Sequence, residues 1–392
     1  MKRFIIKIIA RLRDLLYYLK YFFAFSNNDG NQYILFDSYA GKTFGDNPYY
    51  IFFKLLNSNY KLVWVFNNEK MINEFNKTYP NHLAIKYKSL AHFKYLKKAS
   101  YWIFNYKTPP YFIKKDSTIF IQTWHGIPLK KLGNDLENTN QTFYRSMQSY
   151  QQMANSYSDE GKKCDYFISP TSFSSNKFSS AFNFDKNKII ESNYPRNELL
   201  LNHTSSDIKK IKEELNISEG KKIILYAPTY RDNNSNLLNG YQSNYVLDFL
   251  KAKTLLENYI ILYKPHYLIS NTLDINNESI IDVSNYSKLD NLMIISDILI
   301  TDYSSIYFDY SLLKRPIHFY MPDLFDYKDN LRGFYIDIDN DLPNNYYENV
   351  YALEKAILNN SVNKNKQKHF YEKFSYYELN YEKILSIIKN ES

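Results

Sequence analysis

The sequence contains little cysteine and little glycine, and both shortages exclude classes of site. Its one cysteine, Cys164, rules out an intrachain disulfide and a zinc cluster of thiolates, and favours a reducing, cytoplasmic setting. The nine glycines form neither a G-x-G-x-x-G motif nor a P-loop, so a conventional dinucleotide or ATP site is poorly supported. No acidic cluster has the spacing of metal ligands, and we therefore expect neither a metal nor a cofactor.

The positive charge of the chain is concentrated at its N-terminus. Residues 1–24 carry six basic side chains and one acidic one, a net +5, so only +3 of the formal +8 remains for the rest of the chain. The main part of the protein is therefore nearly neutral, which argues against a nucleic-acid partner. At 392 residues with 44% hydrophobic side chains, the chain is long enough to bury the cores of two domains.

Residues 2–23 form an amphipathic pattern when they are wound as a helix. Their apolar side chains fall within an arc of roughly 140°, and all six basic residues lie outside it. No apolar run here is long enough to span a bilayer. A basic amphipathic helix of this kind lies in the membrane interface and is attracted to anionic lipid, whereas packing on the protein's own core is the alternative. The arc contains Phe4, Ile5, Ile8, Ile9, Leu12, Leu15, Leu16, Leu19, Phe22 and Phe23.

After a polar break near residues 26–30, short apolar runs alternate with helix-like segments. This alternation predicts an α/β protein with two doubly wound, Rossmann-like domains that face each other across a cleft. The expected organisation is a membrane-contact helix at 1–26, an acceptor-side domain at 27–204 and a donor-binding domain at 205–392. The strand candidates are Tyr33–Asp37, Leu62–Phe66, Tyr101–Tyr106, Thr118–Gln122, Tyr166–Ser169 and Lys188–Ser192, then Lys222–Tyr226, Tyr259–Tyr263, Ile280–Val283, Asp297–Thr301 and Pro316–Tyr320.

A histidine follows one of the predicted strands of the first domain. Residues Thr118–Ile121 form an apolar run, and the segment Gln122–Gly133 (QTWHGIPLKKLG) places His125 on the turn at its end. Open α/β sheets bind their ligands beyond the carboxyl ends of their strands. Gly126 lets the backbone approach a ligand closely, and histidine is well suited to take a proton near neutral pH. We therefore favour a catalytic His125 over a capping or core histidine.

A second group of polar residues follows the strand candidates of the C-terminal half. Asp302, Ser304 and Ser305 lie where an apolar run passes into a predicted helix, and hydroxyls with free N–H groups at such a point bind phosphate oxygens, although an ordinary N-cap has the same pattern. Loops with proline present cations at other strand ends, and together they are suited to a diphosphate. These loops contain Arg196, Thr229, Arg231, Lys264, His266 and Arg332.

Five stretches of the chain resemble the CDP-glycerol glycerophosphotransferase family, the teichoic-acid primases and polymerases. They cover roughly residues 100–340 in order, and the long final stretch is highly specific. The resemblance implies a GT-B fold and transfer of a polyol phosphate from CDP-glycerol or CDP-ribitol to a lipid-linked saccharide or polyol-phosphate acceptor, with release of CMP. It also implies peripheral attachment to the cytoplasmic face of the cell membrane. The stretches are Gln122–Gly133, Ser169–Ser175, Tyr194–Asn197, Leu225–Asp232 and Ile295–Asp337.

The resemblance suggests a division of roles among these residues. We expect His125 to act as the general base for the acceptor hydroxyl, while His266 holds the diphosphate and the CMP leaving group. Lys264 stands where the family usually has arginine, which changes a planar fork into a point charge. The predicted catalytic residues are His125 and His266, and the predicted donor-binding residues are Gly126, Arg196, Thr229, Arg231, Lys264, Asp302, Ser304, Ser305 and Arg332.

Two other functions stay open on the sequence alone. One is a sugar transferase of the same fold that uses a nucleotide-sugar donor, because a fold does not determine a substrate. The other is a membrane-bound protein that binds polyanions without catalysis, suggested by the pI of about 8.9 and the many aromatic residues.

Overall fold

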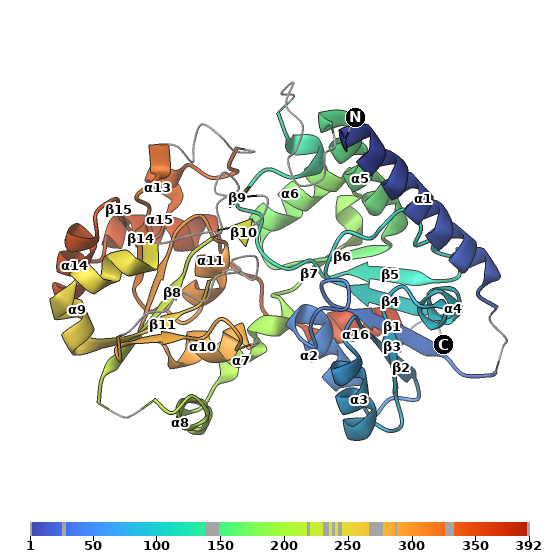
Figure 1. Cartoon of the computed structure of the whole chain (residues 1–392), viewed down its shortest axis with the longest axis horizontal. Helices are drawn as coiled ribbons and strands as arrows, with labels where there is room; N and C mark the ends of the chain where they lie inside the picture. Colours follow the sequence, from blue (N-terminus) through green and yellow to red (C-terminus); the bar gives the residue numbers. More distant parts are fainter. Residues whose placement is uncertain are drawn as a thin grey trace. The chain divides into compact units, whose positions relative to one another are not determined.

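The computed structural model describes residues 2–25, 29–137, 149–217, 220–229, 235–236, 240–241, 245–265, 277–286, 288–325 and 333–389. These residues form two compact α/β units, each with its own sheet (Figure 1). Unit 1 consists of Met1–His125, Leu132–Arg196 and Tyr376–Ser392. Unit 2 consists of Gly126–Lys131 and Asn197–Ser375.

Unit 1 is built on a parallel sheet of seven strands in the order β3-β2-β1-β4-β5-β6-β7. The order reverses between β1 and β4, as in doubly wound Rossmann-like sheets. The register places Phe36 of β1 beside Ile103 of β4, so these two strands reach the carboxyl edge together. The strands are β1 (Tyr33–Asp37), β2 (Lys61–Phe66), β3 (Leu83–Lys86), β4 (Tyr101–Phe104), β5 (Ile119–Gln122), β6 (Tyr166–Ser169) and β7 (Ile189–Glu191).

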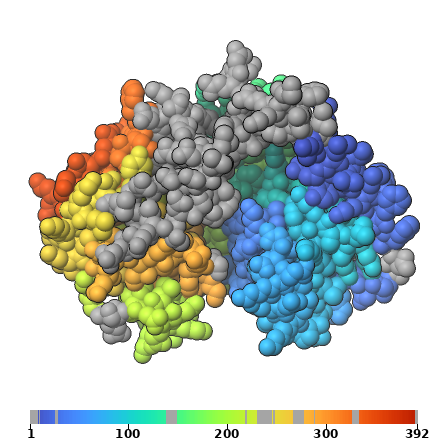
Figure 2. All heavy atoms as spheres, viewed as in Figure 1, coloured from blue at the N-terminus to red at the C-terminus, as the bar shows by residue number. Residues whose placement is uncertain are grey.

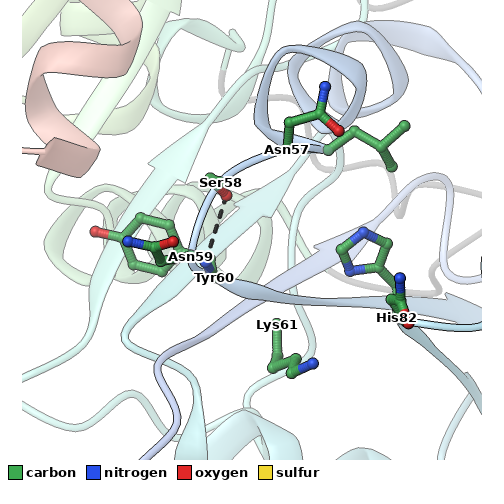
Figure 3. Close-up of a pocket in the computed structure, with 8 residues that line it drawn as sticks. Asn57, Ser58, Asn59, Tyr60, Lys61 and His82 are labelled. Atoms are coloured by element: carbon green, nitrogen blue, oxygen red, sulfur yellow. Dashed lines mark hydrogen bonds between the residues drawn. The ribbon is translucent and has the colours of Figure 1, made fainter.

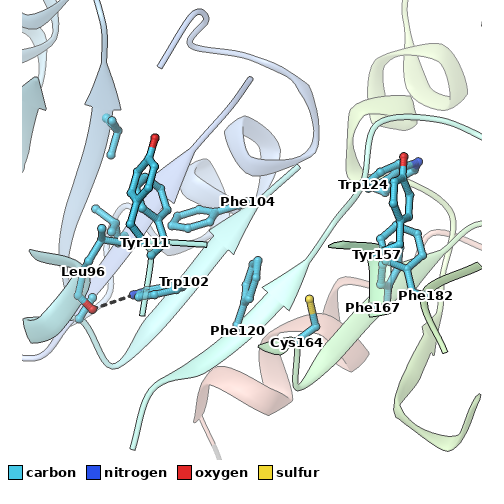
Figure 4. Packing of buried hydrophobic residues seen from close by; sticks show 14 of the residues in the cluster. Leu96, Trp102, Phe104, Tyr111, Phe120, Trp124, Tyr157, Cys164, Phe167 and Phe182 are labelled. Carbon is cyan, nitrogen blue, oxygen red and sulfur yellow. Dashed lines mark hydrogen bonds between the residues drawn. The ribbon is translucent and has the colours of Figure 1, made fainter. Parts of the chain in front are cut away.

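Helices cover both faces of this sheet, because alternate residues of each strand are apolar on both sides. In β1, Leu35 belongs to one buried cluster, and Ile34 and Phe36 belong to the other. Figure 4 shows part of the first cluster. Its helices are α1 (Lys2–Phe23), α4 (Leu90–Lys98), α5 (Tyr150–Lys163) and α6 (Ser172–Phe182), and those of the second are α2 (Asp46–Leu55), α3 (Glu69–Thr78) and α16 (Tyr381–Lys389).

Unit 2 repeats the same plan with six parallel strands in the order β12-β11-β8-β13-β14-β15. Ile224 and Ile261 face one buried cluster, while Leu225 and Leu299 are fully buried as well, so both faces are covered. The strands are β8 (Lys222–Ala227), β11 (Tyr259–Tyr263), β12 (Ile280–Asp282), β13 (Ile298–Thr301), β14 (Ile317–Tyr320) and β15 (Tyr346–Tyr347), and β9 (Ser235–Asn236) pairs with β10 (Gly240–Tyr241) in a separate antiparallel sheet. The helices are α7 (Glu198–Asn202), α8 (Ser205–Glu214), α9 (Lys253–Asn258), α10 (Leu289–Ile295), α11 (Ile306–Ser311), α13 (Ile338–Asp341), α14 (Val350–Leu358) and α15 (Lys364–Lys373).

The expected strands are present, and the sequence prediction missed the edge strands β3 and β15 and the short pair β9 and β10. In β3 only Ile85 is buried, so the strand lacks the continuous apolar run of a central strand. The strand β15 has only two residues, both half-buried. The expected strand at 101–106 ends at Phe104, because Asn105 and Tyr106 leave the sheet and use their polar groups elsewhere.

The compact units do not follow the expected domain boundaries. The segment Gly126–Lys131 belongs to unit 2. The main segment of unit 2 begins at Asn197 rather than at residue 205, and the Asn197 Nδ2 atom donates to Asp309 Oδ1 of α11 at 3.4 Å. The C-terminal segment from Tyr376 belongs to unit 1, because Ile384 and Ile388 of α16 are fully buried in its core. The sequence pattern identified the helix but contained no sign of which sheet it covers.

The helix α1 contacts the rest of unit 1 through tyrosines, and its leucines are exposed. The Tyr17 ring lies 4.8 Å from the Tyr111 ring, and Tyr21 is buried. Leu12 and Leu16 on another side of the helix are 57% and 60% exposed. Figure 2 shows the blue atoms of α1 at the surface. Among the helices in the described part of the chain, none combines the length and the apolar composition that crossing a bilayer requires.

We expect Ile384→Ala to lower the free energy of unfolding of unit 1 by about 2–5 kcal/mol, because it leaves a cavity in a fully buried position. All three tryptophans of the chain, Trp64, Trp102 and Trp124, lie in unit 1, so tryptophan fluorescence during urea unfolding reports on this unit. Ser386→Ala on the exposed side of α16 is the matched control, with an expected change of about 0.5 kcal/mol or less. An unchanged midpoint for Ile384→Ala contradicts the assignment of α16 to this core.

Candidate active site

The candidate site in unit 1 lies at the carboxyl edge of its sheet. Three strands end there side by side: β1 leads into Tyr39, β4 into Asn105 and β5 into His125. This edge flanks the point where the strand order reverses, which is where open α/β sheets bind their ligands. The predicted residue His125 therefore lies where the sequence pattern placed it.

Backbone and aromatic contacts hold the imidazole of His125. Its Nδ1 atom lies 2.5 Å from the carbonyl oxygen of Asn105. The ring stacks on Trp124 with centroids 4.5 Å apart, and the Tyr39 ring lies 5.5 Å away. Trp124 itself is packed edge-on against Phe182, 5.1 Å between centroids, as part of the aromatic group at the right of Figure 4. The core of unit 1 thus fixes the residue beside the histidine.

These contacts determine the protonation state of His125. A carbonyl oxygen only accepts, so Nδ1 carries the hydrogen and Nε2 of the neutral ring has the lone pair. Burial lowers the pKa of His125, and the bond to Asn105 and the charge of Asp46 oppose that effect only in part. The imidazole is therefore neutral at pH 7 and can take a proton at Nε2.

Arg196 lies against the turn that carries His125. Its Nη1 atom donates to the carbonyl oxygen of His125 at 2.8 Å and pairs with Asp46 Oδ2 at 3.0 Å. The sequence prediction assigned Arg196 to the donor phosphates. The structure uses at least part of its guanidinium to hold the backbone of the turn.

The carboxyl edge of unit 2 brings four predicted donor-binding residues together. Thr229 follows β8 and Asp302 follows β13, the two strands at which the order of this sheet reverses, and the Thr229 N–H donates to Asp302 Oδ1 at 2.8 Å. Asp302 is almost fully buried. Ser304 and Ser305 are half-buried just before α11, and Ser305 occupies the N-cap position without a side-chain capping bond.

Lys264 follows the neighbouring strand β11, but its ammonium is directed at the backbone. The Nζ atom donates to the carbonyl oxygens of Val283, Ser284 and Tyr286 at 3.2, 2.6 and 2.8 Å. An ammonium has three N–H donors, and all three have partners here. The structure therefore gives Lys264 a role in fixing the loop after β12, which differs from the predicted contact with a diphosphate.

Of the four remaining predicted residues, Gly126, Arg231, His266 and Arg332, the structure describes Gly126. Gly126 has a φ of 151°, in the region that favours glycine, and it begins the short segment that belongs to unit 2. In that segment Lys131 N–H donates to Gly333 at 3.1 Å. Among the residues that the structure describes, no group of three His, Cys, Asp or Glu side chains is placed to hold a metal ion. Arg231, His266 and Arg332 lie outside the described residues, and their roles stay predictions.

Sequence reasoning missed the residues that surround His125. Tyr39, Asp46, Asn47 and Asn105 all contact its ring, its turn or its partner Arg196. Two signals were available. Asn105 is a polar residue at the end of an apolar run, and Asp46-Asn47 precedes Pro48 at a helix start, where an Asx pair is often used to bond nearby backbone.

A cavity of about 390 Å³ lies elsewhere on unit 1 (Figure 3). Residues 56–61 and 81–82 line it, and His82 and Lys61 are among them. It is formed where β2 and β3 begin, and parallel strands place that edge opposite the one that carries His125. We therefore assign the candidate active site to the carboxyl edge and not to this cavity.

The comparisons with known proteins agree with this fold. The family model of CDP-glycerol:poly(glycerophosphate) glycerophosphotransferase matches residues 19–385. The chain is 38% identical over 358 residues to the teichoic acid poly(glycerol phosphate) polymerase of Bacillus spizizenii, covering 88% of each protein. It is 38% identical over 331 residues to the teichoic acid glycerol-phosphate transferase of Staphylococcus aureus, covering 83% of this chain and 82% of that one.

A solved structure extends the likeness to three dimensions. A variant of the wall teichoic acid polymerase TagF, soaked with CDPG, aligns with a TM-score of 0.84 and 34% identity over 99% of this chain and 96% of that one. The predicted architecture of two Rossmann-like units and the predicted enzyme class are thereby confirmed. The chain belongs to the CDP-glycerol:poly(glycerophosphate) glycerophosphotransferase family.

Proposed function

We propose that this enzyme transfers glycerol phosphate from CDP-glycerol to a hydroxyl of a lipid-linked acceptor in teichoic acid synthesis. In this reaction the acceptor oxygen forms a bond to the β-phosphorus, the bond from that phosphorus to the bridging oxygen breaks, and CMP leaves. The hydroxyl proton goes to the enzyme. No redox partner is needed.

The observation that carries the proposal is the state of His125. A neutral alcohol is a weak nucleophile, and a base that accepts its proton is worth about 10²–10⁴ in rate. The bond from Nδ1 to the Asn105 carbonyl leaves Nε2 as the proton acceptor, and burial keeps the ring neutral. Both features are what a general base at neutral pH requires.

Unit 2 supports the donor side of the reaction. Ser304 and Ser305 combine hydroxyls with the first N–H groups of α11, and Thr229 lies at the adjacent strand end. Phosphoryl transfer depends on positioning and on neutralising the phosphate charge. Arg231, His266 and Arg332 are the residues that we propose as the source of that charge, with CDP-ribitol as the alternative donor.

The first test supplies the wild-type protein with CDP-glycerol, CDP-ribitol or UDP-glucose and a lipid-diphosphate disaccharide, and reads product masses. We expect a product heavier by one or more glycerol phosphates, and we expect His125→Ala to lower turnover by about 10²–10⁴ while calorimetry still detects donor binding.

Because burial places the pKa of His125 below its ordinary value, the wild-type rate should fall as the pH drops through that pKa.

The matched control for this test is His82→Ala, a half-buried histidine of the same unit at the opposite edge of the sheet. It should retain turnover. Transfer from UDP-glucose alone would indicate a sugar transferase, and salt-sensitive binding of polyanions without any transfer would indicate a binding protein. Near-normal turnover of His125→Ala would exclude the base role.

We also propose that α1 holds the enzyme at the cytoplasmic face of the membrane. The tyrosines of α1 contact unit 1, which leaves Leu12, Leu15 and Leu16 more than half exposed and turned to the surroundings. Arg11, Arg13 and Lys20 on the same helix are exposed as well. Exposed aliphatic side chains flanked by cations are suited to the interface of an anionic bilayer.

The double substitution Leu12→Glu with Leu16→Glu should lower the partition of the protein onto vesicles of phosphatidylglycerol and phosphatidylcholine by at least about tenfold, because it replaces two exposed leucines, which contact with lipid would bury, by charged side chains. Sedimentation with vesicles measures the partition, and vesicles of phosphatidylcholine alone should bind more weakly. Leu201→Glu, at a leucine in α7 of unit 2 that is 42% exposed, is the control. Equal loss for both variants contradicts a specific role of α1.

A further inference from the structure

The turn that carries His125 is held by its backbone carbonyls. Asn47 Nδ2 donates to the carbonyl oxygens of Thr123 and Trp124 at 3.2 and 3.0 Å, and Arg196 Nη1 donates to that of His125 at 2.8 Å. Three successive carbonyl oxygens thus accept bonds from outside the turn. Trp124 has a φ of 50°, a conformation that persists only where its surroundings enforce it.

Asp46 organises the donors of these bonds. Its Oδ2 atom accepts from Tyr39 Oη at 2.7 Å and pairs with Arg196 Nη1 at 3.0 Å. Asn47, the next residue, accepts from the Arg196 N–H through Oδ1 at 3.1 Å. The Asp46 and Arg196 side chains are only 9% and 17% exposed, so water screens the pair weakly.

The backbone at Asp46 is itself unusual. Its φ is 62°, which aspartate and asparagine adopt more easily than other residues with a side chain. Tyr39, whose hydroxyl donates to Asp46, has a φ of 51°. Such conformations gather at functional sites, and here they lie on the two segments that meet at His125.

The two charges beside the imidazole act in opposite directions. The guanidinium of Arg196 disfavours a proton on His125, and the carboxylate of Asp46 favours one. Burial would raise the pKa of Asp46, but the charge of Arg196 and the bonds from Tyr39 and Asn47 outweigh it and hold that pKa below its ordinary value. Asp46 is therefore ionised at the pH at which the enzyme works.

We propose that Asp46 is a positioning residue for His125: it fixes Arg196 against the turn and offsets the guanidinium charge, so that the imidazole can accept a proton beside a cation. This inference rests on the proposed role of His125 as the base. It also gives Arg196 a role besides the predicted contact with the donor phosphates. Through Nη1 this residue anchors the backbone of the turn that carries His125.

The test is Asp46→Asn, which keeps the shape of the side chain and its tolerance of a positive φ but removes the charge. We expect kcat for glycerol phosphate transfer to fall by about tenfold to a hundredfold, with the KM for CDP-glycerol close to the wild-type value, because the loss affects the reacting geometry and not the donor contacts. The pKa of His125 should fall, which moves the acidic limb of the rate profile to lower pH.

Histidine NMR measures that pKa directly. The chain has seven histidines, and the spectrum of His125→Asn assigns the signal. This readout is needed because burial raises the pKa of the neighbouring β1 residue Asp37 to about 7, so a rate profile alone does not identify the titrating group. Asp37 accepts hydrogen bonds from Tyr106 and Gly41, which Asp46→Asn does not change, so Asp37 should titrate alike in the wild-type protein and in Asp46→Asn.

Asp165→Asn is the matched control. This carboxylate of unit 1 pairs with Lys114 at 3.0 Å and accepts from the Phe120 N–H at the opposite edge of the sheet, so its loss should reduce stability without moving the His125 titration. If Asp46→Asn does not fold, Tyr39→Phe, which removes one bond to Asp46, should produce a smaller change of the same sign.

An unchanged kcat and an unchanged His125 titration in both variants would overturn the assignment of Asp46. Turnover that survives in His125→Asn would instead refute the base role, and with it the proposed function of this residue. The two failures are therefore distinguishable in one set of proteins.

Discussion

The candidate site depends on the hydrogen bonds that hold the carbonyl groups of residues 123–125. They come from α2 and from Arg196, and a fourth bond joins the His125 ring to Asn105. Each partner lies at the carboxyl edge of the same parallel sheet. The strand order of that sheet brings the ends of β1, β4 and β5 together, so the fold itself supplies the partners.

Two of the predicted donor-binding cations, Lys264 and Arg196, support the backbone. Lys264 donates to three carbonyl oxygens of one loop in unit 2, and Arg196 donates to the His125 turn in unit 1. A half-buried charge needs such partners, because its desolvation is otherwise costly. Positive charge in a motif is therefore not by itself evidence of contact with phosphate.

The N-terminal helix has one side that packs on the protein and another that is exposed. Its tyrosines pack on the core of unit 1, and its leucines face outward. Packing on the protein's own core, the alternative interpretation of the amphipathic pattern, thus describes the tyrosine side of α1, and membrane contact of the leucines stays a proposal. The apolar arc that the sequence indicated contains none of the packed tyrosines. Aromatic side chains with a polar end can be buried against the protein while aliphatic ones stay available to lipid.

The sequence by itself determined the alternating elements, the Rossmann-like class and the position of His125 at a strand end, because periodicity and turn residues are local properties. The sequence did not reveal the edge strands β3 and β15, since short, half-exposed strands contain few apolar residues. Only the tertiary structure decided that α16 completes unit 1, that Lys264 supports a loop and that Asp46, Asn47 and Arg196 meet at the histidine. These contacts join residues far apart in the chain, and the spacing of side chains along a sequence does not indicate which distant residues are in contact.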